Sequence, residues 1–131
     1  MTTVITFGTF DVFHVGHLKI LQRSKEEGEK LIVGVSSDAL NFKKKQRYPI
    51  YNQDSRMKII AALACVDDVF LEESLELKSQ YIQEHGATLL CMGDDWSGKF
   101  DDMPCNVKYF ARTPSISTTQ IIETIQSLWF I

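Results

Sequence analysis

The sequence lacks several features that would assign it to a specialised class of protein. Its three cysteines, Cys65, Cys91 and Cys105, are an odd number without CxxC spacing, so we expect reduced thiols packed as small apolar residues and no zinc site. No uncharged apolar run approaches the ~18 residues of a membrane span. The first residues also lack the basic and long apolar stretches of a signal peptide. These absences predict a cytoplasmic protein with no membrane segment.

Excess positive charge and a dinucleotide-binding glycine motif are also missing. The formal net charge is −3 at pH 7, which argues against nucleic acid as a partner because no broad basic surface is implied. No G-x-G-x-x-G follows the first predicted strand, which argues against a redox dinucleotide domain. The 131 residues, 44% of them hydrophobic, contain no repeat or linker, and we expect a single domain over residues 1–131.

Apolar runs alternate with amphipathic segments along the whole chain, which predicts an α/β fold. We expect a doubly wound, mostly parallel five-stranded sheet with helices on both faces. The segment 41–51 contains three consecutive lysines and Pro49, and we expect a mobile basic loop there. Strands are predicted over residues 4–7, 31–35, 66–70, 88–92 and 106–110, and helices over 15–27, from Asn52 or Asp54 to about Leu63, over 75–85 and over 118–128.

Unusual polar residues follow four of the five predicted strands. Because the carboxyl ends of parallel strands meet at one edge of a sheet, these residues should lie close together. They are the segment 8–17 after the first strand, Asp38 and the lysines after the second, residues 93–96 after the fourth and residues 112–119 after the fifth. This coincidence predicts an active site at that edge.

The first polar segment, G-T-F-D-V-F-H-V-G-H from Gly8 to His17, joins a strand to a helix. A helix N-terminus offers free N–H groups and partial positive charge to an anion. His14 and His17, three residues apart, share a face if the helix begins there, and Gly16 allows a ligand to approach the backbone. A single histidine in this position is more often structural, whereas the spaced pair is more specific.

The second polar segment begins with Arg112 and leads into the last predicted helix. A guanidinium group binds phosphate oxygens with two donors, and hydroxyls and free N–H groups at a helix start add to that binding. Ser117 alone could be an ordinary N-cap, but a cap does not account for Arg112. The two segments together therefore predict a polyphosphate site.

Three motifs carry a resemblance to a known family: G-T-F-D-x-x-H-x-G-H from Gly8, M-G-D-D-W-x-G-K-F-D from Met92 and R-T-x-x-I-S-T-T from Arg112. Together they resemble the bacterial glycerol-3-phosphate cytidylyltransferases, which are nucleotidyltransferases with an HxGH motif and a Rossmann-like fold. The resemblance implies transfer of CMP from CTP to a phosphoalcohol, with release of pyrophosphate and no covalent intermediate. It also implies Mg²⁺ bound with CTP and a homodimer.

The resemblance also implies roles for individual residues. We expect no tight protein cage for the metal ion. The implied catalytic residues are His14, His17, Lys44 and Arg112; the implied nucleotide-binding residues are Thr9, Phe10, His14, Gly16, His17, Asp94, Arg112, Ser117, Thr118 and Thr119; and the implied acceptor-binding residues are Asp11, Asp38, Lys44 and Arg56.

The sequence departs from the glycerol-phosphate pattern at two places. The segment 43–56 is closer to the choline- and ethanolamine-phosphate branches, and a tryptophan expected after the third strand is replaced near Leu75. Phosphocholine and phosphoethanolamine therefore remain alternative acceptors to glycerol 3-phosphate. Adenylyl transfer, and nucleotide binding without catalysis, are further alternatives. A lysine run by itself is more often a solvated loop than part of a site.

Overall fold

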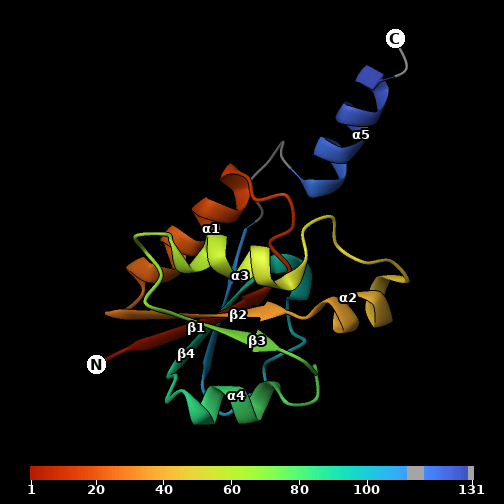
Figure 1. The fold of residues 1–131 in the computed structure, drawn as a ribbon. Helices are drawn as coiled ribbons and strands as arrows, with labels where there is room; N and C mark the ends of the chain where they lie inside the picture. Colours follow the sequence, from red (N-terminus) through yellow and green to blue (C-terminus); the bar gives the residue numbers. More distant parts are fainter. Residues whose placement is uncertain (112–116, 130–131) are drawn as a thin grey trace.

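A five-stranded parallel sheet forms the centre of the protein (Figure 1). The computed structural model describes residues 1–111 and 117–129. The spatial order of the strands is β3-β2-β1-β4-β5, and every adjacent pair is parallel. The strands are β1 (Thr3–Gly8), β2 (Lys30–Ser36), β3 (Asp68–Glu72), β4 (Leu89–Gly93) and β5 (Asn106–Phe110).

Helices cover both faces of this sheet, as the doubly wound prediction requires. In Figure 1, α1 and α3 lie on one face and α4 lies on the other. No helix in the described ranges is both long enough and apolar enough to cross a bilayer. The helices are α1 (Val15–Glu26), α2 (Asp38–Lys45), α3 (Gln53–Ala61), α4 (Lys78–Glu84) and α5 (Thr118–Trp129), with a 3₁₀ turn η1 (Asp94–Trp96) after β4.

Alternate residues of the central strands enter two separate hydrophobic cores. Val4 and Val33 pack with Leu21 of α1 and belong to one core. Ile5 and Ile32 belong to the other, which lies against α4. Because both faces are covered, these strands are continuous apolar runs rather than alternating ones.

The chain reverses its direction of travel across the sheet at β1, which pairs with β2 on one side and with β4 on the other. In open parallel sheets, the loops at such a point diverge and leave a crevice outside the carboxyl ends of the strands. The loop after β1 contains both histidines of the first motif, so the topology brings them to this crevice.

The prediction of a loop over residues 41–51 was wrong for residues 41–45, because α2 extends to Lys45, and is confirmed for residues 46–51, which belong to no helix or strand. The hydroxyl oxygen of Ser37 caps this helix by accepting a hydrogen bond from Leu40 N–H, and Gln46 ends it in a left-handed conformation. The lysines lie in the last turn, where positive charge stabilises a helix. Smaller differences are that β3 begins at Asp68 rather than Val66 and α4 at Lys78 rather than Leu75.

Gly34 provides a test of the packing that holds β1 against β2. It pairs with Phe7, and a Cβ atom on Gly34 would lie 2.6 Å from the Phe7 ring and 2.8 Å from the Phe70 ring. We expect Gly34→Ala to lower the free energy of unfolding by about 1–3 kcal/mol, because both rings must move. Urea denaturation measures the free energy of unfolding. The control Ala61→Ser, at an exposed position, should change that free energy by less than about 0.5 kcal/mol. Equal stability of the two variants would contradict the packing.

Candidate active site

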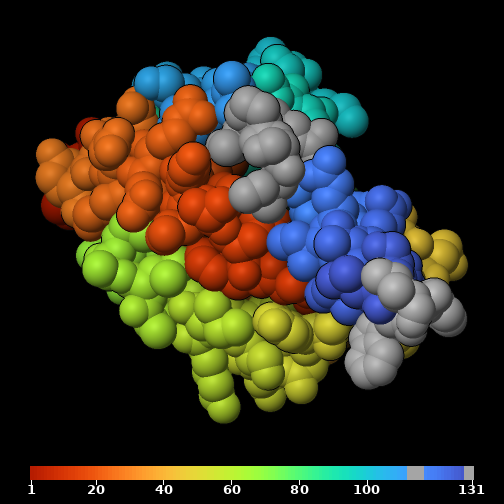
Figure 2. Space-filling view, turned by 90° about the horizontal axis from the view of Figure 1, so that it is seen from above, coloured from red at the N-terminus to blue at the C-terminus, as the bar shows by residue number. Residues whose placement is uncertain are grey.

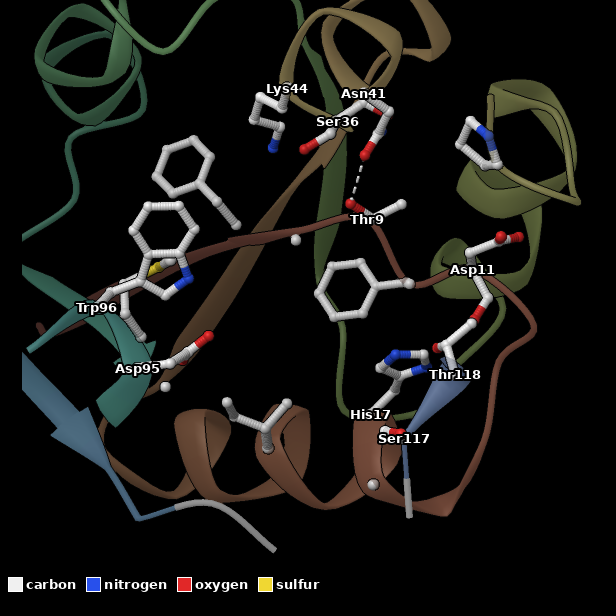
Figure 3. A pocket seen from close by; sticks show the side chains of 18 of the residues that line it. Thr9, Asp11, His17, Ser36, Asn41, Lys44, Asp95, Trp96, Ser117 and Thr118 are labelled. Carbon is white, nitrogen blue, oxygen red and sulfur yellow. Dashed lines mark hydrogen bonds between the residues drawn. The ribbon is translucent and has the colours of Figure 1, made fainter. Parts of the chain in front are cut away.

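A cavity of about 680 Å³ opens at the carboxyl ends of the strands. The close-up shows His17 and Asp11 on one side of it, Lys44 and Asn41 on another, and Trp96 and Asp95 on a third (Figure 3). The segments after β1, β2, β3 and β4 and the start of α5 all contribute to its wall. The edge that the sequence predicted as an active site is therefore a single lined cavity.

Hydrogen bonds to the first turn of α1 hold the two histidines of the cavity in place. His14 is the N-cap, and its Nδ1 accepts a hydrogen bond of 3.0 Å from Gly16 N–H. In return, His17 Nδ1 accepts one of 3.3 Å from His14 N–H. The two rings stack with centroids 3.8 Å apart. The edge-on ring of Phe10 packs against His17 at 5.5 Å.

This cap determines which nitrogen of each ring carries hydrogen. An Nδ1 atom that accepts a hydrogen bond has no hydrogen, so a neutral ring carries it on Nε2. Burial and the neighbouring His14 lower the pKa of His17 to about 4, despite an opposing effect of Asp11. Burial also lowers the pKa of His14. Near neutral pH, both rings are therefore neutral Nε2–H donors on the cavity wall.

The turn between β1 and α1 contains two residues in an unusual backbone conformation. Phe10 and Val12 have φ values of 55° and 48°. Such values are uncommon outside glycine, and for a β-branched residue such as Val12 they are a genuine outlier. Each costs of order ~1–3 kcal/mol and persists only where surrounding contacts enforce it. The turn that carries the histidines is therefore strained and depends on contacts with other segments of the chain.

Three of the four residues predicted to bind the acceptor have their polar groups bonded to other parts of the protein. Arg56 is 0% exposed, does not line the cavity, and donates to Asp38 Oδ1 at 2.7 Å. Asp38 also lies outside the cavity lining. Asp11 lines the cavity, but its carboxylate accepts hydrogen bonds from the backbone N–H groups of Ile50 and Tyr51.

Lys44, predicted from the basic segment, reaches the cavity from α2, on the side away from His17 (Figure 3). Burial lowers the pKa of Lys44, and the opposing effect of the nearby Glu72 carboxylate is smaller. Glu72 is itself buried and pairs with the ammonium group of Lys78 at 2.6 Å. That ammonium group also lies 3.7 Å from the centre of the Phe7 ring. This side of the cavity thus combines two lysines with one carboxylate.

The start of α5 lies against the histidine turn. Thr118 Oγ1 donates to the Asp11 carbonyl oxygen at 3.0 Å, and Ser117 Oγ caps the helix by accepting from Gln120 N–H. In the space-filling view, the red N-terminal turn lies directly beside blue α5 (Figure 2). Ser117, Thr118 and Thr119 line the same cavity as His14 and His17. Arg112, predicted at this helix start, lies outside the described residues.

The remaining predicted residues all lie on the cavity wall. Thr9, Phe10, Gly16 and Asp94 all line the cavity. Thr9 Oγ1 donates to Asn41 Oδ1 at 2.8 Å (Figure 3).

Among the described residues, no group of three or more His, Cys, Asp or Glu side chains could hold a metal ion.

The sequence of residues 5–124 matches the Cytidylyltransferase-like family. The chain belongs to this family. It is 43% identical over 130 residues to a glycerol-3-phosphate cytidylyltransferase of Bacillus subtilis, an alignment that covers 98% of this chain and 100% of the relative. A glycerol-3-phosphate cytidylyltransferase of Staphylococcus aureus is 38% identical over 128 residues, covering 95% and 96% of the two chains.

A solved structure shows the same fold. The lipopolysaccharide core biosynthesis protein of Thermoplasma volcanium superposes with a TM-score of 0.71 at 24% identity, over 88% of this chain and 99% of the other. The Rossmann-like α/β architecture predicted from the sequence is confirmed by this likeness and by the strand order.

Sequence reasoning missed several residues of this cytidylyltransferase-like site. Asn41 is 1% exposed and its side-chain amide donates to the carbonyl oxygens of Ser36 and Ser37, which fixes its oxygen against Thr9. Glu72 and Lys78 form a buried pair beside the cavity. Ser36 directly follows the predicted strand 31–35 and could have been found by its position. Nothing local marks Asn41 or Lys78, whose placement depends on packing.

The histidine geometry predicts an unusual titration. Nitrogen-15 NMR of the imidazoles should show the Nε2–H tautomer for both rings, with His17 titrating near pH 4 and His14 below 6.5. Because the folded pKa of His17 lies below its unfolded value, acidification from pH 6.5 towards 4 should favour unfolding. His14→Asn keeps a capping oxygen and removes a neighbouring charge, so the pKa of His17 should rise. Titration of His17 near 6.5 in the wild-type protein would contradict this environment.

Proposed function

We propose that the protein transfers the cytidylyl group of CTP to glycerol 3-phosphate, giving CDP-glycerol and pyrophosphate. The observation that carries the proposal is 43% identity to a glycerol-3-phosphate cytidylyltransferase along almost the whole of both chains. The cavity supports it, because two helix starts with different polar groups meet at one site. That arrangement suits a ligand with several phosphates.

The acceptor needs no protein base in this reaction. A phosphate monoester has a second pKa near ~6 and is mostly a dianion at neutral pH. One of its oxygens attacks the α-phosphorus of CTP, the bond from that phosphorus to the bridging oxygen breaks, and the electron pair leaves with pyrophosphate. The protein must bring two anions together and stabilise the charge that develops between them.

The paired imidazoles are the groups best placed to stabilise that charge. As neutral Nε2–H donors they can each give a hydrogen bond to a phosphate oxygen without a prior change of protonation. Their Nδ1 atoms are held by the backbone, so the donors keep their direction while charge moves. Lys44 supplies positive charge from another side of the same cavity. Thr118 and Thr119 lie at the second helix start, where free N–H groups add to binding.

Three further features complete the proposal, and the first two come from the family resemblance. Mg²⁺ would bind together with CTP and neutralise charge on its phosphate oxygens. The protein acts as a homodimer, which light scattering measures. It acts in the cytoplasm, which suits the reduced thiols expected from its three cysteines.

The acceptor can be identified by pyrophosphate release. With CTP, Mg²⁺ and glycerol 3-phosphate we expect turnover, and removal of the metal with EDTA should abolish it. Phosphocholine or phosphoethanolamine in place of glycerol 3-phosphate, or ATP in place of CTP, should each give less than about a tenth of the kcat/KM, a difference of ~1.4 kcal/mol. Turnover with phosphocholine but not with glycerol 3-phosphate would reject the proposed acceptor, and preference for ATP would reject cytidylyl transfer.

The histidine contribution can be separated from helix capping. In His17→Asn the amide oxygen can still accept from His14 N–H, but no donor remains at the position of Nε2. We expect kcat to fall by about 10²–10³, as for loss of one donor to a developing charge, while CTP affinity changes much less. His85→Asn is the matched control, because His85 stacks on Phe70 and does not line the cavity. A loss confined to CTP affinity, with kcat unchanged, would show that His17 contributes ground-state binding rather than transition-state stabilisation. Absence of turnover by the unmodified protein, with CTP still bound, would show a binding module rather than an enzyme.

A further inference from the structure

The segment 46–52, between α2 and α3, forms one wall of the cavity. Arg47, Tyr48, Pro49 and Ile50 all line it. Sequence reasoning predicted a mobile loop here, and the side chains of Tyr48 and Ile50 are indeed 64% and 63% exposed. The backbone, however, is bonded to buried groups on both sides.

Asp11 holds this segment from the histidine turn. Its Oδ2 accepts Ile50 N–H at 2.7 Å and its Oδ1 accepts Tyr51 N–H at 2.9 Å. Oδ1 also accepts Val12 N–H at 3.0 Å. Hydrogen bonds from backbone N–H to a charged acceptor are among the stronger ones. One carboxylate, 9% exposed, thus joins the segment to the strained turn.

Arg56 holds the same segment from α3. Its Nε donates to the Tyr51 carbonyl oxygen at 2.9 Å, so the backbone of Tyr51 is bound on both its N–H and its C=O. Its Nη1 donates to the carbonyl oxygens of Thr9 at 2.9 Å and Ser36 at 2.7 Å, and its Nη2 to Asp38. A planar guanidinium group has five donors in a fixed arrangement. It therefore fixes the ends of β1 and β2 and the segment 46–52 relative to one another.

We propose that Asp11 and Arg56 are positioning residues that clamp the segment 46–52 as a preformed wall of the nucleotide cavity and hold the strained histidine turn in place. The proposal rests on the proposed function only for the identity of the nucleotide. Both residues act through backbone groups of Thr9, Val12, Ile50 and Tyr51 rather than by contact with the reacting phosphates. A preformed wall avoids the entropy cost of ordering these residues when the nucleotide binds.

Amide hydrogen exchange of the protein without nucleotide tests the clamp directly. In Asp11→Asn the side chain has one acceptor oxygen in place of two, so at least one of Ile50 and Tyr51 loses its partner. We expect exchange at one or both amides to accelerate at least tenfold, with Ile5 and Val33 in the central strands unchanged. Asp54→Asn, an exposed carboxylate of α3, is the control and should leave all four amides unchanged.

Arg56→Lys tests the other side, because one ammonium group cannot reach all four acceptors of the guanidinium. We expect exchange at Tyr51 to accelerate likewise, with exposed Lys58→Gln as the control. If Arg56→Lys does not fold, Asp38→Asn weakens the same anchor at a side chain that is 29% exposed. It should give a smaller acceleration at the same amide.

Binding and turnover distinguish positioning from chemistry. In Asp11→Asn we expect the Kd for CTP by calorimetry to rise about tenfold, because the wall must then be ordered when the nucleotide binds. We expect kcat to fall with it, because the histidine turn is less well held. A collapse of kcat with unchanged Kd and unchanged exchange would overturn the proposal by showing direct contact with the reacting groups. Acceleration that includes Ile5 and Val33 would overturn it by showing general loss of stability. The exchange experiment needs no substrate, so it tests the clamp whether or not CDP-glycerol forms. Failure to form CDP-glycerol would overturn only the proposed function.

Discussion

The exchange of hydrogen bonds between His14 and His17 at the start of α1 determines the chemistry of the site. It uses one nitrogen of each ring to begin a helix and leaves the other nitrogen, with its hydrogen, at the cavity. Burial keeps the rings uncharged, because the pKa of His17 falls to about 4. The same pair of side chains therefore caps a helix and presents neutral hydrogen-bond donors to the cavity.

This arrangement depends on a turn that is unfavourable by itself. Phe10 and Val12 adopt left-handed conformations, and the energy for them must come from contacts elsewhere. Buried charge supplies part of it: the Asp11 carboxylate and the Arg56 guanidinium bind backbone groups from three segments. Burying these charges is tolerated because their hydrogen-bonding capacity is used by backbone and by Asp38. The geometry of the site thus depends on Asp11, which lies on the cavity wall, and on Arg56, which lies beneath it.

The sequence predicted the sheet because each strand is an apolar run, and covered faces make such runs continuous. It predicted which segments line the cavity because parallel strands bring their carboxyl ends together. It could not show that Arg56 is buried, since an arginine after a basic segment is consistent with either a phosphate or four protein acceptors. It missed α2 because the lysines and Pro49 favoured a loop, although Ser37 is a residue type that commonly caps a helix. The expected role of Arg112 stays a prediction.

The strand order has a consequence for how the protein is made. β1 is the first strand synthesised, yet its neighbour β4 lies about eighty residues later, as the pairing of Val4 with Leu89 shows. Contacts so distant in sequence form late and slow folding. A nascent chain that has completed only β1, β2 and β3 already has both histidines but neither the far wall of the cavity nor Thr118, which bonds to Asp11 across 107 positions. An incomplete chain therefore has one half of the cavity and an unpaired edge of β1, and the cavity wall is complete only when β4 and the start of α5 are in place.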